Sequence, residues 1–232
     1  MTDLTSTYKG MKEKYREIFL KSSDAIKSRV EELRPKGFDG DIFEKYEPES
    51  AGANWQKNVL DMFENDISKE IYRKWQEVLE LRKNYECKGC ATCCNLACSE
   101  YSYEEIKKRA ENGDNFAKQF VSIFVPYKTR EDAEEIYPEY LKLLSENVEG
   151  EVYFYHCPKL NECKRCSDYE NRPKICRDFP DNPLDILPKS CGFYEWRKQV
   201  EPVVMMLHAM VEILEYYKLK VESGKLTVGI NA

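Results

Sequence analysis

Five of the ten cysteines in this 232-residue chain lie within twelve positions, in the segment CKGCATCCNLAC at 87–98. Cys87, Cys90 and Cys93 follow the spacing C-x2-C-x2-C, and Cys94 is adjacent to the last of them. Because two intervening residues let neighbouring thiolates face one centre, this spacing is typical of zinc and iron–sulfur sites. Adjacent side chains diverge, so we expect one sulfur of the Cys93–Cys94 pair to serve a first site. The other would serve a second site or a hydrogen bond.

The remaining cysteines are also grouped, and none lies outside 87–191: they are Cys157, Cys163, Cys166, Cys176 and Cys191. Ten cysteines suffice for two sites of four ligands, with two left over. Zinc is one interpretation, since Cys87/Cys90 and Cys163/Cys166 form two C-x2-C units. However, 72 residues separate these units, far more than the roughly 15–20 of a zinc ribbon. Three cysteines at successive x2 intervals therefore favour iron–sulfur, with 4Fe–4S first, and leave zinc open.

The segment 157–180 is net positive in an otherwise acidic chain of net charge −6. It holds six basic residues against four acidic ones: Lys159, Lys164, Arg165, Arg172, Lys174 and Arg177, with Glu162, Asp168, Glu170 and Asp178. A thiolate-bound cluster carries negative charge, which arginine N–H groups can compensate. We therefore expect Arg172 and Arg177 to lie beside the site, while the lysines remain at the surface. His156, next to Cys157, is either a ligand or a packed ring.

The overall composition restricts the other partners. A net charge of −6 gives no general attraction to phosphates, so nucleic acid is not expected. No apolar run approaches membrane-spanning length, and the N-terminal segment has no apolar core of a signal peptide. We therefore expect a cytoplasmic protein, in which clustered cysteines more often bind metal than form disulfides.

The segments that must position the cysteines are mainly helical in pattern. Apolar residues at helical spacing predict long helices over about 8–33, 55–81 and 193–222, the last containing Pro202. Shorter helices are expected over 102–113, which the capping pair Ser102 and Glu105 opens, and over 114–124 and 130–146. Residues 151–155 read as a short strand and 157–191 as an irregular loop. The expected fold is a mainly α bundle enclosing a cysteine-rich region, with at most a few short strands. Its parts are an N-terminal helical segment (1–85), the metal-binding region (86–192) and a C-terminal helix on the same core (193–232), forming a single domain.

Two motifs together resemble the YkgJ-like cysteine-cluster family, the CxxCxxCC zinc- or iron-chelating domain. They are CKGCATCC and, further on, CSDYENRPKICRDFP. The family pattern falls on Cys87, Cys90, Cys93, Cys94, Cys157, Cys166, Tyr169, Arg172, Pro173, Cys176, Arg177, Phe179, Pro180 and Cys191. The resemblance implies that the eight cysteines in it bind metal, with Tyr169, Arg172 and Arg177 lining the bound group. Cys98 and Cys163 are additional to the pattern.

Several functions remain open on the sequence. The favoured one is a metal-binding protein with at least one 4Fe–4S cluster and a redox or catalytic role, acting on a protein substrate or with a redox partner. The first alternative is a scaffold or interaction module ordered by structural zinc. A second alternative follows from the resemblance, because some members carry the label flagellin N-methylase. That label implies S-adenosylmethionine-dependent methylation of lysine, although the chain has no C-x3-C-x2-C triad and no glycine-rich nucleotide loop. Whether the protein is an enzyme is not decided.

Overall fold

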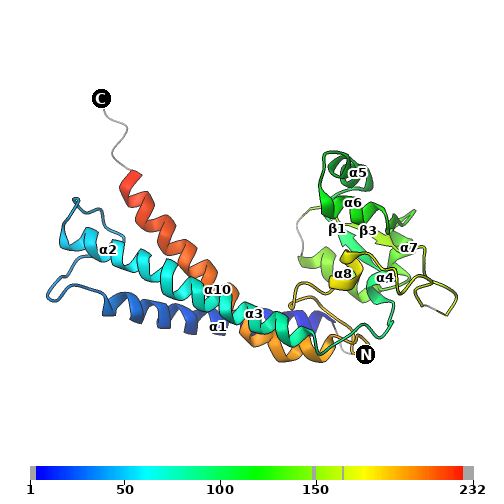
Figure 1. Cartoon of the computed structure of the whole chain (residues 1–232), viewed down its shortest axis with the longest axis horizontal. Coiled ribbons are helices and arrows are strands. Elements are labelled where there is room, and N and C mark those ends of the chain that lie inside the picture. The colour runs from blue at the N-terminus through cyan, green and yellow to red at the C-terminus, as the bar shows by residue number, and fades with distance from the viewer. Residues whose placement is uncertain (1–3, 148–149, 164, 227–232) are drawn as a thin grey trace. The chain divides into compact units, whose positions relative to one another are not determined.

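A computed structural model describes residues 4–147, 150–163 and 165–226 (Figure 1). The described chain is mainly helical with one small sheet, which confirms the mainly α class. It divides into two compact units. The helical unit contains Met11–Asn84 and the chain from Lys198 onward, and the cysteine unit contains Tyr85–Arg197 with the beginning of the first helix. All ten cysteines therefore lie in one unit.

The helical unit is built on the long helices that the apolar patterns predicted. These are α1 (Leu4–Glu32), α2 (Ala51–Met62), α3 (Ser68–Arg82) and α10 (Tyr194–Leu226). Trp55 is fully buried at the centre, and its indole Nε1–H donates to the main-chain oxygen of Val30 at 3.0 Å. Phe63 and Ile67 are fully buried in the same apolar cluster, with Ile213 and Leu214 of α10. This unit thus has its own hydrophobic core.

The helix expected over 55–81 is interrupted by a π-helical turn, η1 (Phe63–Ile67). The amide of Ser68 donates to the main-chain oxygen of Phe63 five residues earlier, and the Ser68 hydroxyl donates to the same oxygen at 2.8 Å. A π turn inserts one residue into a helix and so rotates the helix that follows it. The chain therefore continues helically from α2 through η1 into α3.

The cysteine unit contains a three-stranded antiparallel sheet of order β1-β3-β2: β1 (Ala97–Ser99), β3 (Tyr153–His156) and β2 (Val125–Pro126). Successive side chains of β3 point to opposite faces. Tyr155, fully buried, packs with α5 (Tyr103–Glu111) and α6 (Asn115–Val121). Phe154 packs in a separate cluster with Ala133 and Leu141. The strand expected at 151–155 is confirmed, whereas β1 and β2 are too short to leave an alternating pattern.

Helix α5 begins and ends where the sequence predicted. Ser102 and Glu105 form a reciprocal capping box, in which the Ser102 amide donates to the Glu105 carboxylate at 2.8 Å. The helix ends before Gly113, whose φ of 99° is the left-handed conformation that glycine adopts at helix ends. Asp114 then caps α6 by accepting the amides of Phe116 and Ala117.

The prediction of a single helix over 130–146 is wrong. The chain forms α7 (Arg130–Glu134), a turn, and α8 (Pro138–Asn147). Proline has no amide hydrogen to donate within a helix, but it fits the first turn of a new one. Pro138 therefore begins α8 rather than continuing α7.

Two one-turn helices lie in the cysteine segments themselves. They are α4 (Thr92–Asn95), within the first cysteine run, and α9 (Lys174–Asp178), within the segment predicted as an irregular loop. None of the described helices combines the length and the apolar character that crossing a bilayer requires.

Candidate metal centre

The first cysteine run forms a tight loop because two of its residues adopt left-handed backbone conformations. Gly89 has a φ of 71° and Ala91 a φ of 62°. Glycine takes such angles freely, whereas alanine does so at a cost of about 1–2 kcal/mol. Ala91 precedes α4 and accepts the amide of Asn95 at 2.9 Å, so its strained conformation starts the turn that carries Cys93 and Cys94.

A second local feature repeats at four cysteines: the amide two residues further along the chain donates to the sulfur. The Gly89 amide donates to Cys87 Sγ at 3.4 Å. The same relationship joins Thr92 to Cys90, Lys159 to Cys157 and Phe193 to Cys191, and each of these three bonds favours the thiolate. At Cys157 burial outweighs the bond, and at Cys191 the hydrogen bond to Cys90 and burial do, so the pKa of both is raised. Amide hydrogen bonds to sulfur stabilise thiolates and tune the metals that thiolates hold. These sulfurs are therefore prepared for a bound cation.

Cys191 lies beside the first loop although about a hundred residues separate them. Its thiol is hydrogen-bonded to Cys90, which lowers the pKa of Cys90 to about 5 and raises that of Cys191. Gly192 makes this approach possible, because a Cβ there would lie 1.8 Å from the main-chain oxygen of Glu86. Negative charge on Cys87 and Cys90 raises the pKa of both Cys191 and Cys93. We call Cys87, Cys90, Cys93 and Cys191 the loop group.

The other four cysteines of the family pattern gather around the sheet. The Cys157 amide donates to the main-chain oxygen of Cys94 at 2.7 Å, directly beyond the β1–β3 pairing. Cys157 is buried, and Cys94 and Cys176 pack against the same apolar cluster. Cys166 is brought back towards Cys157 by a turned segment, in which Leu160 and Cys166 form a β-bridge. We call Cys94, Cys157, Cys166 and Cys176 the sheet group.

Electrostatics places the sheet-group thiols near one another. Burial, followed by negative charge on Cys94 and Cys157, raises the pKa of Cys176 to about 11, and Cys166 adds to the effect. Burial likewise raises the pKa of Cys157, again with contributions from Cys94 and Cys166. Cys176 sits on α9, which is held in place where the Ile175 amide donates to Gln119 Oε1 at 3.1 Å. Four distant segments thus converge on one region.

The adjacent pair Cys93 and Cys94 joins the two groups. Their thiols are hydrogen-bonded to each other, which raises the pKa of Cys93 and lowers that of Cys94. Each also interacts with thiols of its own group, as described above. The two groups therefore meet at this pair, and its role as a branch point between two sites stays a prediction.

Tyr169 and Arg172 lie next to the thiols, as the resemblance implied. The Tyr169 hydroxyl donates to the main-chain oxygen of Cys87 at 2.9 Å. The Arg172 guanidinium stacks 3.6 Å from the centre of the Tyr169 ring. Its positive charge favours the thiolate of both Cys94 and Cys176, although burial outweighs it at Cys176 and leaves that pKa raised. Arg177 donates to the main-chain oxygen of Arg172 and so supports this arginine.

The residues outside the family pattern behave differently. The Cys98 thiol is hydrogen-bonded to the Tyr140 hydroxyl, and Cys163 is exposed. His156 packs its ring 4.7 Å from that of Tyr127, which favours the packed alternative.

Sequence reasoning missed the role of Gly192. The only signal was a glycine directly after a cysteine.

Within the described ranges, no group of three or more His, Cys, Asp or Glu side chains is arranged to hold a metal ion. Two pairs of thiols are hydrogen-bonded, Cys90 with Cys191 and Cys93 with Cys94, and none of the ten cysteines forms a disulfide. The donor chemistry fits zinc or iron, since thiolates are the ligands these metals prefer in structural and iron–sulfur sites. Binding would need side-chain rotation to bring each set together.

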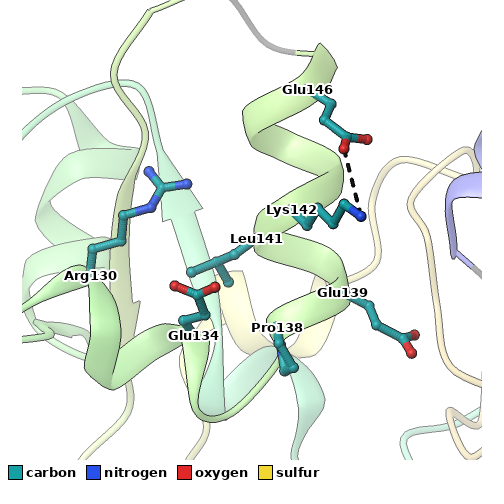
Figure 2. A pocket seen from close by; sticks show the side chains of 7 residues that line it. All are labelled: Arg130, Glu134, Pro138, Glu139, Leu141, Lys142 and Glu146. Atoms are coloured by element: carbon teal, nitrogen blue, oxygen red, sulfur yellow. Dashed lines mark ion pairs between the residues drawn. The ribbon is translucent and has the colours of Figure 1, made fainter.

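A pocket of about 480 Å³ lies between α7 and α8 (Figure 2). Its lining residues fall within 130–146, a part of the sequence without cysteines. Arg130 and Glu134 reach into the space from α7, and Leu141 points into it from α8. Lys142 pairs with Glu146 at 3.9 Å on its rim. The pocket is lined by no cysteine and is not part of the thiol site.

The cysteine unit thus has the features of a thiolate metal-binding domain. A family model described as "Putative zinc- or iron-chelating domain", with the motif name CxxCxxCC, matches residues 86–218. The chain belongs to this family, whose pattern supplies both groups of thiols. No curated protein and no solved structure matches the chain.

Proposed function

We propose that this metal-binding chain holds iron in at least one 4Fe–4S cluster through its eight family-pattern cysteines, and that it serves in electron transfer. The observation that carries the proposal is the loop at 87–94. It combines C-x2-C-x2-C spacing with amide donors to sulfur, from Gly89 to Cys87 and from Thr92 to Cys90. Such a loop with a distant fourth cysteine is typical of 4Fe–4S proteins.

The chain's own residues would supply binding, charge compensation and exclusion of water. Arg172 brings positive charge to the thiols, and burial of Cys157 keeps water from part of the site. The cluster itself supplies one-electron chemistry when bound. Because four thiolates per centre leave no open coordination position, the ligand set favours electron transfer over catalysis at the metal. A redox role implies a partner protein that exchanges electrons with it, and a cytoplasmic location remains a prediction.

Structural zinc is the second candidate, because the matching family is described as chelating zinc or iron. Four thiolates in a closed site suit zinc equally well. The zinc protein would be a scaffold whose loops are ordered by the metal. We do not extend the proposal to methyl transfer, since the chain lacks a glycine-rich nucleotide loop.

Metal and sulfide analysis of anaerobically purified protein, with an absorption spectrum, separates the candidates. The iron–sulfur proposal expects a brown protein with iron and acid-labile sulfide in equal amounts. Stoichiometric zinc in a colourless, sulfide-free protein would replace it with the zinc scaffold. A protein that binds neither metal, even after anaerobic reconstitution, would contradict both.

A further inference from the structure

We propose that the chain holds two neighbouring four-thiolate metal centres, one formed by the loop group and one by the sheet group, with Cys93 and Cys94 each serving a different centre. This inference rests on the proposed function, because it requires that the thiols bind metal. It does not depend on whether that metal is zinc or iron. The assignment is therefore testable with either.

The number of thiols requires more than one centre. Zinc and 4Fe–4S clusters each take four protein thiolates in closed sites. The family pattern supplies eight cysteines, and all eight lie in the cysteine unit. One centre would leave four thiols with no role in binding.

The backbone assigns the fourth ligand of the loop group. Cys87, Cys90 and Cys93 come from a single loop, and the contact of Gly192 with Glu86 places Cys191 at its start. The hydrogen bond between the Cys90 and Cys191 thiols shows that the two sulfurs already meet. Rotation of the Cys87 and Cys93 side chains among their staggered states is then enough to complete the set.

The backbone assigns the sheet group in the same way. The hydrogen bond from the Cys157 amide to the Cys94 main-chain oxygen and the Leu160–Cys166 bridge bring three of the ligands towards the end of β3. Cys176 shares an apolar cluster with Cys94 and Cys157. No residue of this group comes from the C-x2-C-x2-C run, so the two sets do not compete for ligands.

Cys93 and Cys94 divide because they are successive residues of a helical turn, α4. Side chains of successive helical residues differ in direction by about 100°. One small ion is therefore poorly placed to bind both sulfurs. Two centres joined at this pair use the divergence, because each sulfur serves its own centre. In the metal-free chain the two thiols are hydrogen-bonded to each other.

Cobalt(II) titration of the anaerobic, metal-free full chain tests the division. Thiolate-to-cobalt absorption reports ligation directly, so the readout needs neither iron nor activity. The wild-type chain should bind two cobalt ions. Cys191→Ala and Cys176→Ala should each bind half as much, and the double variant none. Cys98→Ala and Cys163→Ala are the matched controls and should bind as much as the wild type.

Pairing of variants identifies the groups. Cys93→Ala combined with Cys191→Ala should still bind one ion, whereas Cys93→Ala combined with Cys176→Ala should bind none. Cys94→Ala combined with Cys176→Ala should still bind one ion, whereas Cys94→Ala combined with Cys191→Ala should bind none. The proposal is overturned if the wild type binds a single ion, or if pairs within a group lose as much as pairs across groups. It is equally overturned if Cys191→Ala and Cys176→Ala each abolish all binding.

The same titration separates this inference from the proposed function. A single ion bound by the wild type would end the division but keep metal binding. No cobalt bound by the wild type would end both. Far-UV circular dichroism of each variant identifies any that fails to fold, and Cys90→Ala and Cys166→Ala then replace Cys191→Ala and Cys176→Ala.

Discussion

Residue 192 lies against the main-chain carbonyl of Glu86 so closely that only a residue without a Cβ fits, the atoms otherwise lying 1.8 Å apart. The two residues flank the ends of the cysteine region, next to Cys191 and Cys87. This contact fixes the distance between the last cysteine and the first loop. The contact holds Cys191 beside the loop through a residue that supplies no thiol.

We therefore expect Gly192→Ala to impair metal binding without removing any thiol. Forcing a methyl group into this space costs about 1–3 kcal/mol and must push the backbone of 191–192 away from Glu86. Metal content and thermal unfolding of the metal-loaded protein measure the effect. Gly10→Ala is the control, since a Cβ at position 10 meets nothing within 4 Å. Unchanged metal content in Gly192→Ala would show that Cys191 is held by other contacts.

Arg172 should tune the bound group through its charge. Its guanidinium lies over the Tyr169 ring, and its charge favours the thiolates of Cys94 and Cys176. With an iron–sulfur cluster in place, Arg172→Ala should lower the reduction potential by on the order of tens of millivolts, because reduction adds negative charge that the arginine stabilises. Potentiometric titration measures this. Lys174→Ala, which removes an exposed lysine paired with Asp178, should change the potential much less. Equal shifts in both variants would argue against a specific role for Arg172.

Asp185 should make stability fall as pH rises. Burial, with the charge of Asp181, raises the pKa of Asp185 to about 6, against the attraction of Arg197. The folded chain then binds this proton more tightly than the unfolded chain, so the contribution of Asp185 to stability is greatest below about pH 4 and is lost as the pH rises through about 6. Asp185→Asn should remove this loss. The difference in melting temperature, Asp185→Asn minus wild type, should therefore be more positive at pH 7.5 than at pH 4.5. The exposed Asp39→Asn should show no such difference, and a pH-independent difference for Asp185→Asn would contradict the expected burial of its charge.

Trp55→Ala should destabilise the helical unit and leave the thiols intact. The indole is fully buried, donates to Val30 and carries the Arg34 guanidinium 4.3 Å from its centre. Truncation of such a side chain costs about 3–5 kcal/mol. Chemical denaturation followed by circular dichroism measures the loss, and cobalt binding below the transition measures the site. Trp75→Ala is a milder comparison, because that ring is partly exposed. Loss of cobalt binding by folded Trp55→Ala would show that the cysteine unit depends on the helical core.

The long helices and the α5 caps were predictable because their signals are local. The apolar pattern of α1 and the Ser102–Glu105 box each involve residues within a few turns of one another. The helix over 130–146 was mispredicted because the apolar pattern continues across Pro138, although the backbone does not. The short α9 also escaped prediction, since a single turn flanked by prolines has no periodicity to detect.

For the candidate site, the spacing of Cys87, Cys90 and Cys93 was informative because three ligands share one loop. The positions of Cys157 and Cys191 depend on contacts between distant segments. One is the hydrogen bond from Cys157 to Cys94, and the other is the approach of Gly192 to Glu86. No local pattern encodes such pairings. The family resemblance names eight cysteines as metal ligands, which stays a prediction, and it gives no division among them.

The hydrogen bond from Cys157 to Cys94 also has a consequence during synthesis. The ribosome makes the chain from its N-terminus at about 5–20 residues per second. About 60 residues separate Cys94 from Cys157, and about 100 separate it from Cys191, so the first four thiols emerge several seconds before their partners. During that interval they are nucleophiles with no sheet to pack against. Delivery of the metal must therefore either wait for the later segments or rely on a carrier that occupies these thiols first.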